Sequence, residues 1–370
     1  MKFDTKFLRI IIAWLITFPE IFIRLVFSVT IIPIKESLNI NYFFASLLLY
    51  SFYIGYALFN LPMGHFVDKY GYRVISASLI FLGIFSIIFS FSKNYYISLF
   101  SMFMLGVFSA PTYIGSIKIV SEKEKKFRAT AISLLNTAGP SSLLITNIFL
   151  TGNLSLIDWR SVYVYISIVA FVMSIPLFFI KKFDEKNVKN AINKKSILAA
   201  FVRFSGFWGM WGISTYLFLL SHLEFNLSYI YSGLVSAIFS LGAILSIPIS
   251  GIISDIFKNR KGVSSIYLIL FFILLILFPF IGPYFMFPIS FILGFISFGY
   301  RTPLDAFISE ITKGKEATSM GLANLISQPS LIIVPAIIGA IITYTGNIFL
   351  SFITLSIGPL VAFIILRIID

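Results

Sequence analysis

Hydrophobic residues run along this chain in twelve long stretches, and short polar segments separate them. Each stretch is about 20 residues long, which is the length that an α-helix needs to cross the hydrocarbon core of a bilayer. The pattern therefore predicts an all-α polytopic membrane protein with twelve transmembrane helices. The predicted spans are residues 8–33, 42–63, 74–92, 96–119, 129–151, 161–180, 197–221, 229–250, 263–282, 285–309, 317–343 and 347–368.

One polar stretch is much longer than the others. Residues 181–195 read KKFDEKNVKNAINKK and separate the first six spans from the last six. The remaining loops are short, so helices that follow each other in the chain must pack antiparallel. We predict an N-terminal six-helix bundle at residues 1–180, a cytoplasmic linker at 181–196 and a C-terminal six-helix bundle at 197–370.

The two halves repeat each other. The loop at residues 64–73 returns at residues 251–260, with an offset of 187 residues, and residues 103–145 match residues 291–333 at 14 of 43 positions. Both copies lie at corresponding places in halves of six spans, so the repeat keeps its membrane orientation and predicts two bundles related by pseudo-two-fold symmetry. The matched positions of the loop are Gly64 and Gly251, Asp68 and Asp255, and Arg73 and Arg260.

Composition supports the membrane prediction. Hydrophobic residues make up 58% of the chain and charged residues 12%, with a mean hydropathy of +0.98, whereas soluble domains carry about 25% charged residues. Cysteine is absent, which excludes disulfides and thiolate metal sites. Neither a metal-ligand spacing, nor a Gly-rich phosphate loop, nor a Ser-His-Asp order occurs in the sequence. We therefore expect neither an enzyme nor a cofactor.

The net charge of +13 is explained by topology rather than by nucleic acid. With both termini on one side, 23 of the 28 Lys and Arg residues lie in the N-terminus, the even-numbered loops and the C-terminus. Only Lys35, Lys93 and Arg160 fall at the opposite face, and Arg24 and Arg301 lie inside spans. By the positive-inside rule, both termini are predicted to be cytoplasmic, in a protein of the plasma membrane.

Glu20 and Arg24 are the sharpest candidates for a functional site, because they lie near the middle of the first span. A charge at mid-bilayer costs about 2.5–3.5 kcal/mol on insertion scales, so it must face a wet cavity or a partner. Their i, i+4 spacing places them on one helix face. They are either a structural ion pair or an anion-binding Arg24 beside a proton-titrating Glu20.

Further polar residues lie in later spans. Arg301 and Asp305 repeat the i, i+4 spacing around Pro303, and a proline within a span often marks a broken helix near a binding site. Asp305 is a second proton-coupling candidate, but it lies near the cytoplasmic end of its span, where a gate pair is equally compatible with the sequence. Asn136 and Asn324 are candidates for substrate binding or for hydrogen bonds between helices.

These motifs resemble the major facilitator superfamily. The residues Gly64, Asp68, Gly71 and Arg73 match that family's loop between helices 2 and 3, and residues 122–131 and 158–163 resemble two further family segments. The resemblance implies alternating access between two bundles, with a cytoplasmic gate. The implied gate residues are Gly64, Asp68, Gly71, Arg73, Asp255 and Arg260.

Lys258 and Met102 are two of the positions at which this sequence departs from the family pattern. Lys258 occupies the position of the second loop's glycine, so the first loop is expected to be the working gate. Met102 lies where many proton-coupled members carry an arginine.

Residues 22–30 resemble helix 1 of the organophosphate and organic-anion symporter branch, in which an arginine at the position of Arg24 faces the anionic substrate.

Together these observations predict a monomeric secondary transporter that moves a small solute across the lipid bilayer. The favoured substrate is an organic anion, coupled to protons, with Arg24, Glu20, Arg301, Asn136 and Asn324 as contacts. The alternative is an efflux carrier for hydrophobic or cationic compounds, in which Glu20 without Arg24 is essential. A channel is disfavoured, because a repeat with gate loops suits rocking between two states rather than a fixed pore.

Overall fold

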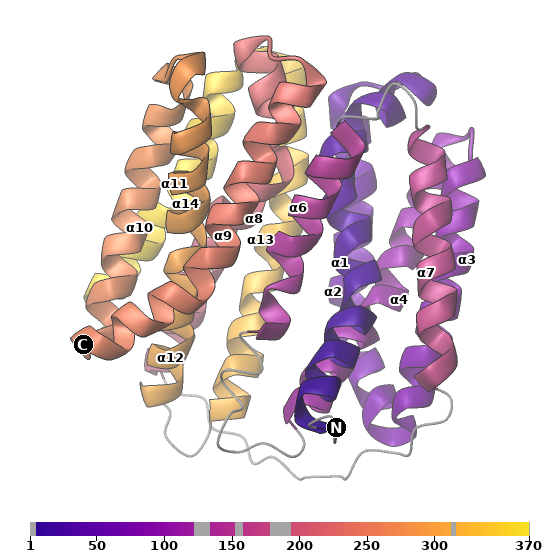
Figure 1. The fold of residues 1–370 in the computed structure, drawn as a ribbon, viewed down its shortest axis with the longest axis horizontal. Coiled ribbons are helices and arrows are strands. Elements are labelled where there is room, and N and C mark those ends of the chain that lie inside the picture. Colours follow the sequence, from indigo (N-terminus) through magenta and orange to yellow (C-terminus); the bar gives the residue numbers. More distant parts are fainter. Residues whose placement is uncertain (1–4, 122–133, 152–157, 178–193, 312–315, 370) are drawn as a thin grey trace. The chain divides into compact units, whose positions relative to one another are not determined.

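The fold was analysed in a computed structural model, which describes residues 5–121, 134–151, 158–177, 194–311 and 316–369. All regular structure in these residues is helical (Figure 1), which confirms the predicted fold class. The first half contains α1 (Thr5–Ser37), α2 (Tyr42–Tyr70), α3 (Tyr72–Phe91), α4 (Tyr95–Ser121), α6 (Ala138–Thr151) and α7 (Trp159–Leu177). The second half contains α8 (Lys194–Phe225), α9 (Tyr229–Phe257), α10 (Arg260–Leu277), α11 (Met286–Gly299), α12 (Arg301–Ile311), α13 (Glu316–Thr345) and α14 (Ile348–Ile368).

The contacts divide the chain into two compact units. Unit 1 comprises residues 1–142 and 153–186, and unit 2 comprises residues 143–152 and 187–370. Figure 1 draws the helices of the first half in indigo to magenta and those of the second in orange to yellow. Most of the predicted linker at 181–196 lies outside the described residues, so the predicted boundaries remain predictions.

Each predicted span coincides with a helix or a pair of helices. Within the described ranges, nine helices are long and apolar enough to cross a membrane, and Trp159–Ile175 is a shorter apolar helix. The fifth predicted span, 129–151, is described only from residue 134 onward. The tenth, 285–309, is divided at Tyr300 into α11 and α12, as expected for a span that contains Pro303.

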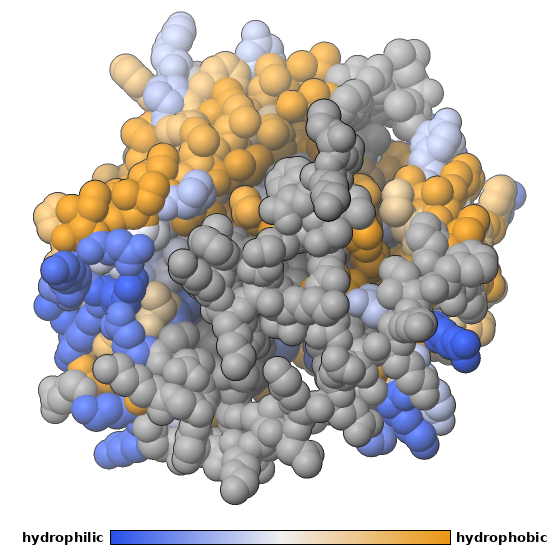
Figure 2. Space-filling view, turned by 60° about the horizontal axis from the view of Figure 1, so that its bottom comes forward, coloured by the Kyte–Doolittle hydropathy of each residue, from blue (hydrophilic) through white to orange (hydrophobic). Residues whose placement is uncertain are grey.

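The surface of the helices carries many large apolar side chains. Large side chains such as Phe91, Leu58 and Ile249 are 70%, 63% and 37% exposed. Figure 2 shows hydrophobic residues over the upper part of the described surface, while hydrophilic residues gather in its lower half. This distribution fits a surface in contact with lipid, because in water such a face would be a site of association.

Small residues allow the tightest helix contacts, and these contacts repeat between the units. In unit 1, Gly106 of α4 packs directly on the backbone of Phe52 in α2. In unit 2, Gly294 of α11 packs in the same way on Phe239 of α9. Such close backbone approach is typical of helix association in membranes. The sequence match of Gly106 with Gly294 therefore reflects a shared packing geometry.

We predict that Gly294→Ala destabilises the protein by about 2 kcal/mol. A Cβ at Gly294 would lie 2.7 Å from the carbonyl carbon of Phe239, and a backbone atom has no other rotamer to adopt. Overpacking of this kind costs about 1–3 kcal/mol or more, which outweighs the roughly 1 kcal/mol that alanine gains over glycine in a helix. Thermal unfolding of the purified protein in detergent measures the effect.

The control is Gly282→Ala, because an added Cβ there meets nothing within 4 Å. This variant should unfold at the temperature of the parent protein. If Gly294→Ala unfolds at the same temperature as Gly282→Ala, α9 and α11 do not pack as closely as the structure shows.

Hydroxyl groups add polar contacts between the helices of unit 1. Thr17 of α1 donates to Ser116 Oγ of α4 over 2.7 Å. Ser76 and Ser86 of α3 donate to the carbonyl oxygens of Ser174 and Tyr163 in α7, over 2.6 and 2.7 Å. In a bilayer the hydrophobic effect does not drive helices together, so hydrogen bonds of this kind contribute to their association. The bond between Thr17 and Ser116 helps to position α1, the helix that carries Glu20 and Arg24.

Candidate functional site

The first candidate site lies in unit 1 around Glu20 and Arg24 of α1. Glu20 is fully buried and Arg24 is 8% exposed. Arg24 Nη1 lies 3.7 Å from Glu20 Oε1, so the two form an ion pair that is longer than a hydrogen bond. The structure therefore brings the predicted pair together on one helix face, inside the unit.

Tyrosines from two other helices surround this pair. Tyr53 and Tyr56 of α2 and Tyr113 of α4 all lie within electrostatic range of the Arg24 guanidinium. Tyr113 also donates to Asn136 Oδ1 over 3.1 Å, which links a predicted site residue to the cluster. Phenol groups from α2 and α4 thus lie near one arginine of α1, and Asn136 contacts one of them. Phenol and amide groups are the kind that orient a small polar ligand.

Glu20 is the least satisfied member of the cluster. Neither of its carboxylate oxygens has a hydrogen-bond partner among the described residues, and the same holds for the hydroxyl group of Tyr53. Buried polar atoms are normally hydrogen-bonded, and an unmade bond costs about 1–3 kcal/mol. Polar atoms without partners inside a bundle are expected where a ligand, a proton or water completes the site.

A second charged cluster lies in unit 2. Arg203 Nη1 of α8 lies 2.7 Å from Asp305 Oδ1 of α12, and Arg301 Nε lies 3.8 Å from Asp305 Oδ2. Arg203 and Arg301 are 2% and 8% exposed. The predicted Arg301–Asp305 pair therefore exists, but the closer partner of Asp305 is Arg203. Two buried arginines share one carboxylate among the described residues.

Aromatic rings complete this second cluster. The guanidinium groups of Arg203 and Arg301 lie 5.1 and 5.4 Å from the ring centroid of Phe207, within the range of cation–π attraction. Tyr300 lies at the break between α11 and α12, fully buried, and its ring fills the space that Gly206 leaves beside it. Its hydroxyl group has no hydrogen-bond partner among the described residues.

Sequence reasoning missed Arg203, Phe207 and Tyr300 in this cluster. The charge count placed Arg203 with the cytoplasmic cations, although apolar residues flank it on both sides in α8. That position inside an apolar helix is the signal that could have found it, because a charge within a span needs a partner. The remaining predicted residue, Asn324, lies in α13, and its side chain lies outside the described residues.

The second copy of the repeated loop forms an ion-pair network within unit 2. Arg260 Nη2 lies 2.9 Å from Asp255 Oδ1, and Arg260 also pairs with Glu310 of α12. Arg260 Nη1 donates to Ser254 Oγ over 3.2 Å. One arginine therefore ties the turn between α9 and α10 to the end of α12.

Both copies of the loop place a residue with positive φ directly after the helix, but their backbones differ in ψ. Gly71 has φ of 70° and its N–H donates to Val67 O over 2.8 Å, where α2 ends. Lys258, at the equivalent place, has φ of 50° in the left-handed region. Gly71 has ψ of −142°, which with its positive φ is a conformation that glycine adopts readily, whereas Lys258 has ψ of 25°. The turn with lysine therefore differs from the turn with glycine. Arg73 is exposed, and the side chain of Asp68 lies outside the described residues, so the expectation that the first copy is the working gate remains a prediction.

The fold and these clusters define a multi-pass α-helical membrane protein built from two related halves, with a buried arginine cluster in each unit. Within the described residues, no group of His, Cys, Asp and Glu side chains could hold a metal ion. Residues 13–335 match the model of the Major Facilitator Superfamily, and the chain belongs to that family. Its family and fold are those of transporters, and it is a membrane-embedded transporter that binds a small-molecule substrate.

Two kinds of relative were found. Over 178 residues the chain is 26% identical to the probable galactarate/D-glucarate transporter GarP of Escherichia coli K12, and equally to that of strain O157:H7. That match covers 46% of this chain and 40% of the relatives' length. A bacterial homolog of the human lysosomal transporter Spinster, solved in an inward-facing and unoccupied conformation, has a TM-score of 0.68 at 16% identity. The structural match covers 100% of this chain and 96% of the other, and it shows the fold alone.

Proposed function

We propose that the protein is a secondary transporter that imports a small organic anion together with protons. The observation that carries the proposal is the buried Glu20–Arg24 pair, enclosed by Tyr53, Tyr56 and Tyr113. An arginine guanidinium binds a carboxylate through two parallel hydrogen bonds, and this geometry discriminates planar anions from other solutes. A buried guanidinium within a span is otherwise costly, so a role in binding accounts for its presence.

The coupling follows from competition for Arg24. In the unloaded protein the charge of Arg24 is balanced by Glu20 at 3.7 Å. A substrate carboxylate that takes hydrogen bonds from Arg24 removes that compensation, and Glu20 has no other hydrogen-bond donor among the described residues. A buried carboxylate without a donor is expensive, so Glu20 takes up a proton as the anion binds. Substrate and proton then move together.

The relatives suggest the class of anion. The E. coli relatives are named as probable transporters of galactarate and D-glucarate, which are sugar acids with a carboxylate at each end. Because the shared region covers only 40% of their length, similarity alone does not assign their substrate to this chain, and a sugar acid is our proposal. Hydroxyl groups of such a substrate are suited to the phenol groups of Tyr53 and Tyr113 and the amide of Asn136.

We also propose that the protein lies in the plasma membrane with both termini in the cytoplasm. The support is the charge asymmetry of the sequence, in which only Lys35, Lys93 and Arg160 fall at the opposite face. In this orientation the turns at Gly71 and Lys258 face the cytoplasm. The gate loops and the linker at 181–196 are then cytoplasmic as well.

The purified protein in proteoliposomes tests the function. With acid outside and neutral buffer inside, radiolabelled galactarate or glucarate should accumulate above its external concentration, and a protonophore should abolish this accumulation. Xylose and glucose, which lack a carboxylate, serve as uncharged controls. If neither sugar acids nor simple dicarboxylates accumulate, while a hydrophobic cation is extruded in a Glu20-dependent way, the protein is an efflux carrier instead.

A further inference from the structure

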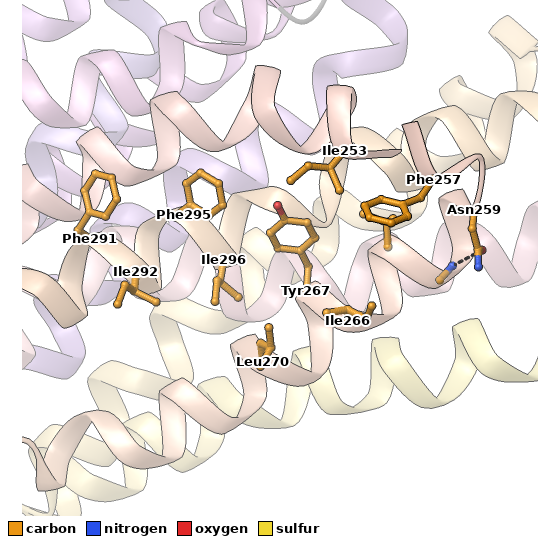
Figure 3. Close-up of a pocket in the computed structure, with 12 residues that line it drawn as sticks. Ile253, Phe257, Asn259, Ile266, Tyr267, Leu270, Phe291, Ile292, Phe295 and Ile296 are labelled. Carbon is orange, nitrogen blue, oxygen red and sulfur yellow. Dashed lines mark hydrogen bonds between the residues drawn. The ribbon is translucent and has the colours of Figure 1, made fainter. Parts of the chain in front are cut away.

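Unit 2 contains an apolar groove that its arginine cluster does not line. It lies between α9, α10 and α11, and its volume is about 650 Å³, within the range of about 300–1,000 Å³ that is typical of ligand pockets. Figure 3 shows the lining side chains in a row, from Phe291 at one end to Asn259 at the other. The lining includes Phe257, Ile266, Tyr267, Leu270, Phe291 and Phe295.

The groove is open to the outside of the helices. Phe257, Ile266 and Leu270 are 70%, 57% and 41% exposed. From Asn259 to Leu270, α10 rises by about 16 Å at 1.5 Å per residue. The hydrocarbon core of a bilayer is about 30 Å thick, so the groove spans about one leaflet. Its length and exposure suit a single acyl chain that lies along α10.

One end of the groove is polar and positively charged. Asn259 caps α10 by accepting a hydrogen bond from Gly262 N–H over 2.8 Å, which Figure 3 shows as a dashed line. Beside it lie Lys258, which is exposed, and Lys261, whose Nζ donates to the carbonyl oxygen of Arg367 over 3.4 Å. Among the described residues, no carboxylate lies within ion-pair distance of either lysine.

The neighbouring charges do not neutralise this end. Arg260 pairs with both Asp255 and Glu310, so these three side chains carry one net negative charge. The two lysines exceed this negative charge by one, so the described residues leave a net positive charge where the groove reaches the polar end of the helices. A negatively charged head group complements this end, and an acyl chain complements the rest.

We propose that the groove binds one acyl chain of an anionic phospholipid, with the phosphate head group beside Lys258 and Lys261. A neutral hydrophobic partner leaves the lysines uncompensated. A symmetric contact with a second copy of the chain brings the two lysine-bearing ends together at one height in the membrane, so like charges oppose it. An anionic lipid satisfies both ends of the groove at once.

Native mass spectrometry of the full chain, purified in detergent and titrated with lipid, tests the proposal. Dioleoyl phosphatidylglycerol should bind more tightly than dioleoyl phosphatidylcholine, which has the same acyl chains. Lys258→Ala should weaken phosphatidylglycerol binding about fivefold, since one lysine near a membrane surface contributes about 1 kcal/mol, and it should leave phosphatidylcholine binding unchanged. Lys69→Ala removes an exposed lysine near the end of α2 in unit 1 and should change neither.

A second pair of variants tests the apolar part. Leu270→Trp fills the groove and should reduce the binding of both lipids, whereas Ile273→Trp, at an exposed position of α10 that does not line the groove, should not. Equal affinity for the two lipids, or unchanged lipid binding by Leu270→Trp, overturns the proposal. A dimer that dissociates in Leu270→Trp also overturns it, because the occupant would then be a second copy of the chain.

Discussion

Replacing Arg24 with alanine is expected to abolish anion binding, with a loss of affinity of about 100-fold or more. Removing one partner of a buried, hydrogen-bonded charge pair costs about 2–5 kcal/mol, and each 1.4 kcal/mol is tenfold in affinity. Arg24 is 8% exposed and lies among Tyr53, Tyr56 and Tyr113, so water cannot easily replace the guanidinium. Isothermal titration of the purified variant with galactarate or another dicarboxylate measures the loss.

Two further variants are informative. One separates the charge of Arg24 from its hydrogen-bond geometry, and the other separates anion binding from proton coupling. Arg24→Lys keeps the charge but loses the bidentate geometry, so it should retain part of the affinity. Glu20→Gln keeps the size of the side chain but cannot exchange a proton, so it should bind the anion while uptake no longer responds to a proton gradient.

The control for Arg24 is Arg367→Ala, at an exposed position near the end of α14, which should bind and transport like the parent protein. Transport of the identified anion by Arg24→Ala at the parental rate would contradict the assignment. If only Glu20→Gln abolishes transport, the cargo is a hydrophobic or cationic compound.

The spans and the repeat could be predicted because they depend on local sequence alone. A stretch of about 20 apolar residues admits only a helix in a bilayer, where every backbone polar group must be satisfied internally. The match of Gly106 with Gly294 also had a physical cause, because both glycines accept the backbone of a neighbouring helix. The spans and the repeat can therefore be predicted from the sequence without knowledge of the tertiary structure.

The turn of the second loop depends on contacts that the loop sequence alone does not predict. The replacement of glycine by Lys258 suggested that the second loop had degenerated. Yet Lys258 adopts φ of 50°, and Arg260 beyond it pairs with Asp255 and Glu310. A lysine pays a steric cost in the left-handed region that glycine does not. The surrounding ion pairs and the Asn259 cap hold the turn in place, and loop sequence alone does not show them.

The partners within each buried cluster depend on contacts between distant parts of the chain. The i, i+4 spacing predicted the Arg301–Asp305 pair, because both residues lie on one helix. The closer pair of Asp305 with Arg203 joins residues 102 positions apart, and no periodicity indicates it. In unit 1, likewise, the spacing showed the Glu20–Arg24 pair but not the tyrosines that enclose it.

The Arg203–Asp305 pair leads to the largest expected effect on stability. Asp305→Ala should reduce the free energy of unfolding by about 3 kcal/mol. The substitution leaves Arg203 and Arg301, which are 2% and 8% exposed, without the carboxylate between them. Breaking a buried pair by removing one partner costs about 3–5 kcal/mol, and the lower end applies because the side chain of Asp305 is 21% exposed. Unfolding of the purified variant in detergent measures the change.

The control is Asp255→Ala, which removes a carboxylate that also pairs with an arginine of unit 2. Its side chain is 68% exposed, so the loss should be no more than about 1 kcal/mol. The double variant Arg203→Met with Asp305→Ala should recover most of the lost stability, because it removes the uncompensated charge together with its partner. If Asp305→Ala costs no more than Asp255→Ala, or if the double variant is as unstable as the two single losses added together, Asp305 does not hold the two buried arginines in place.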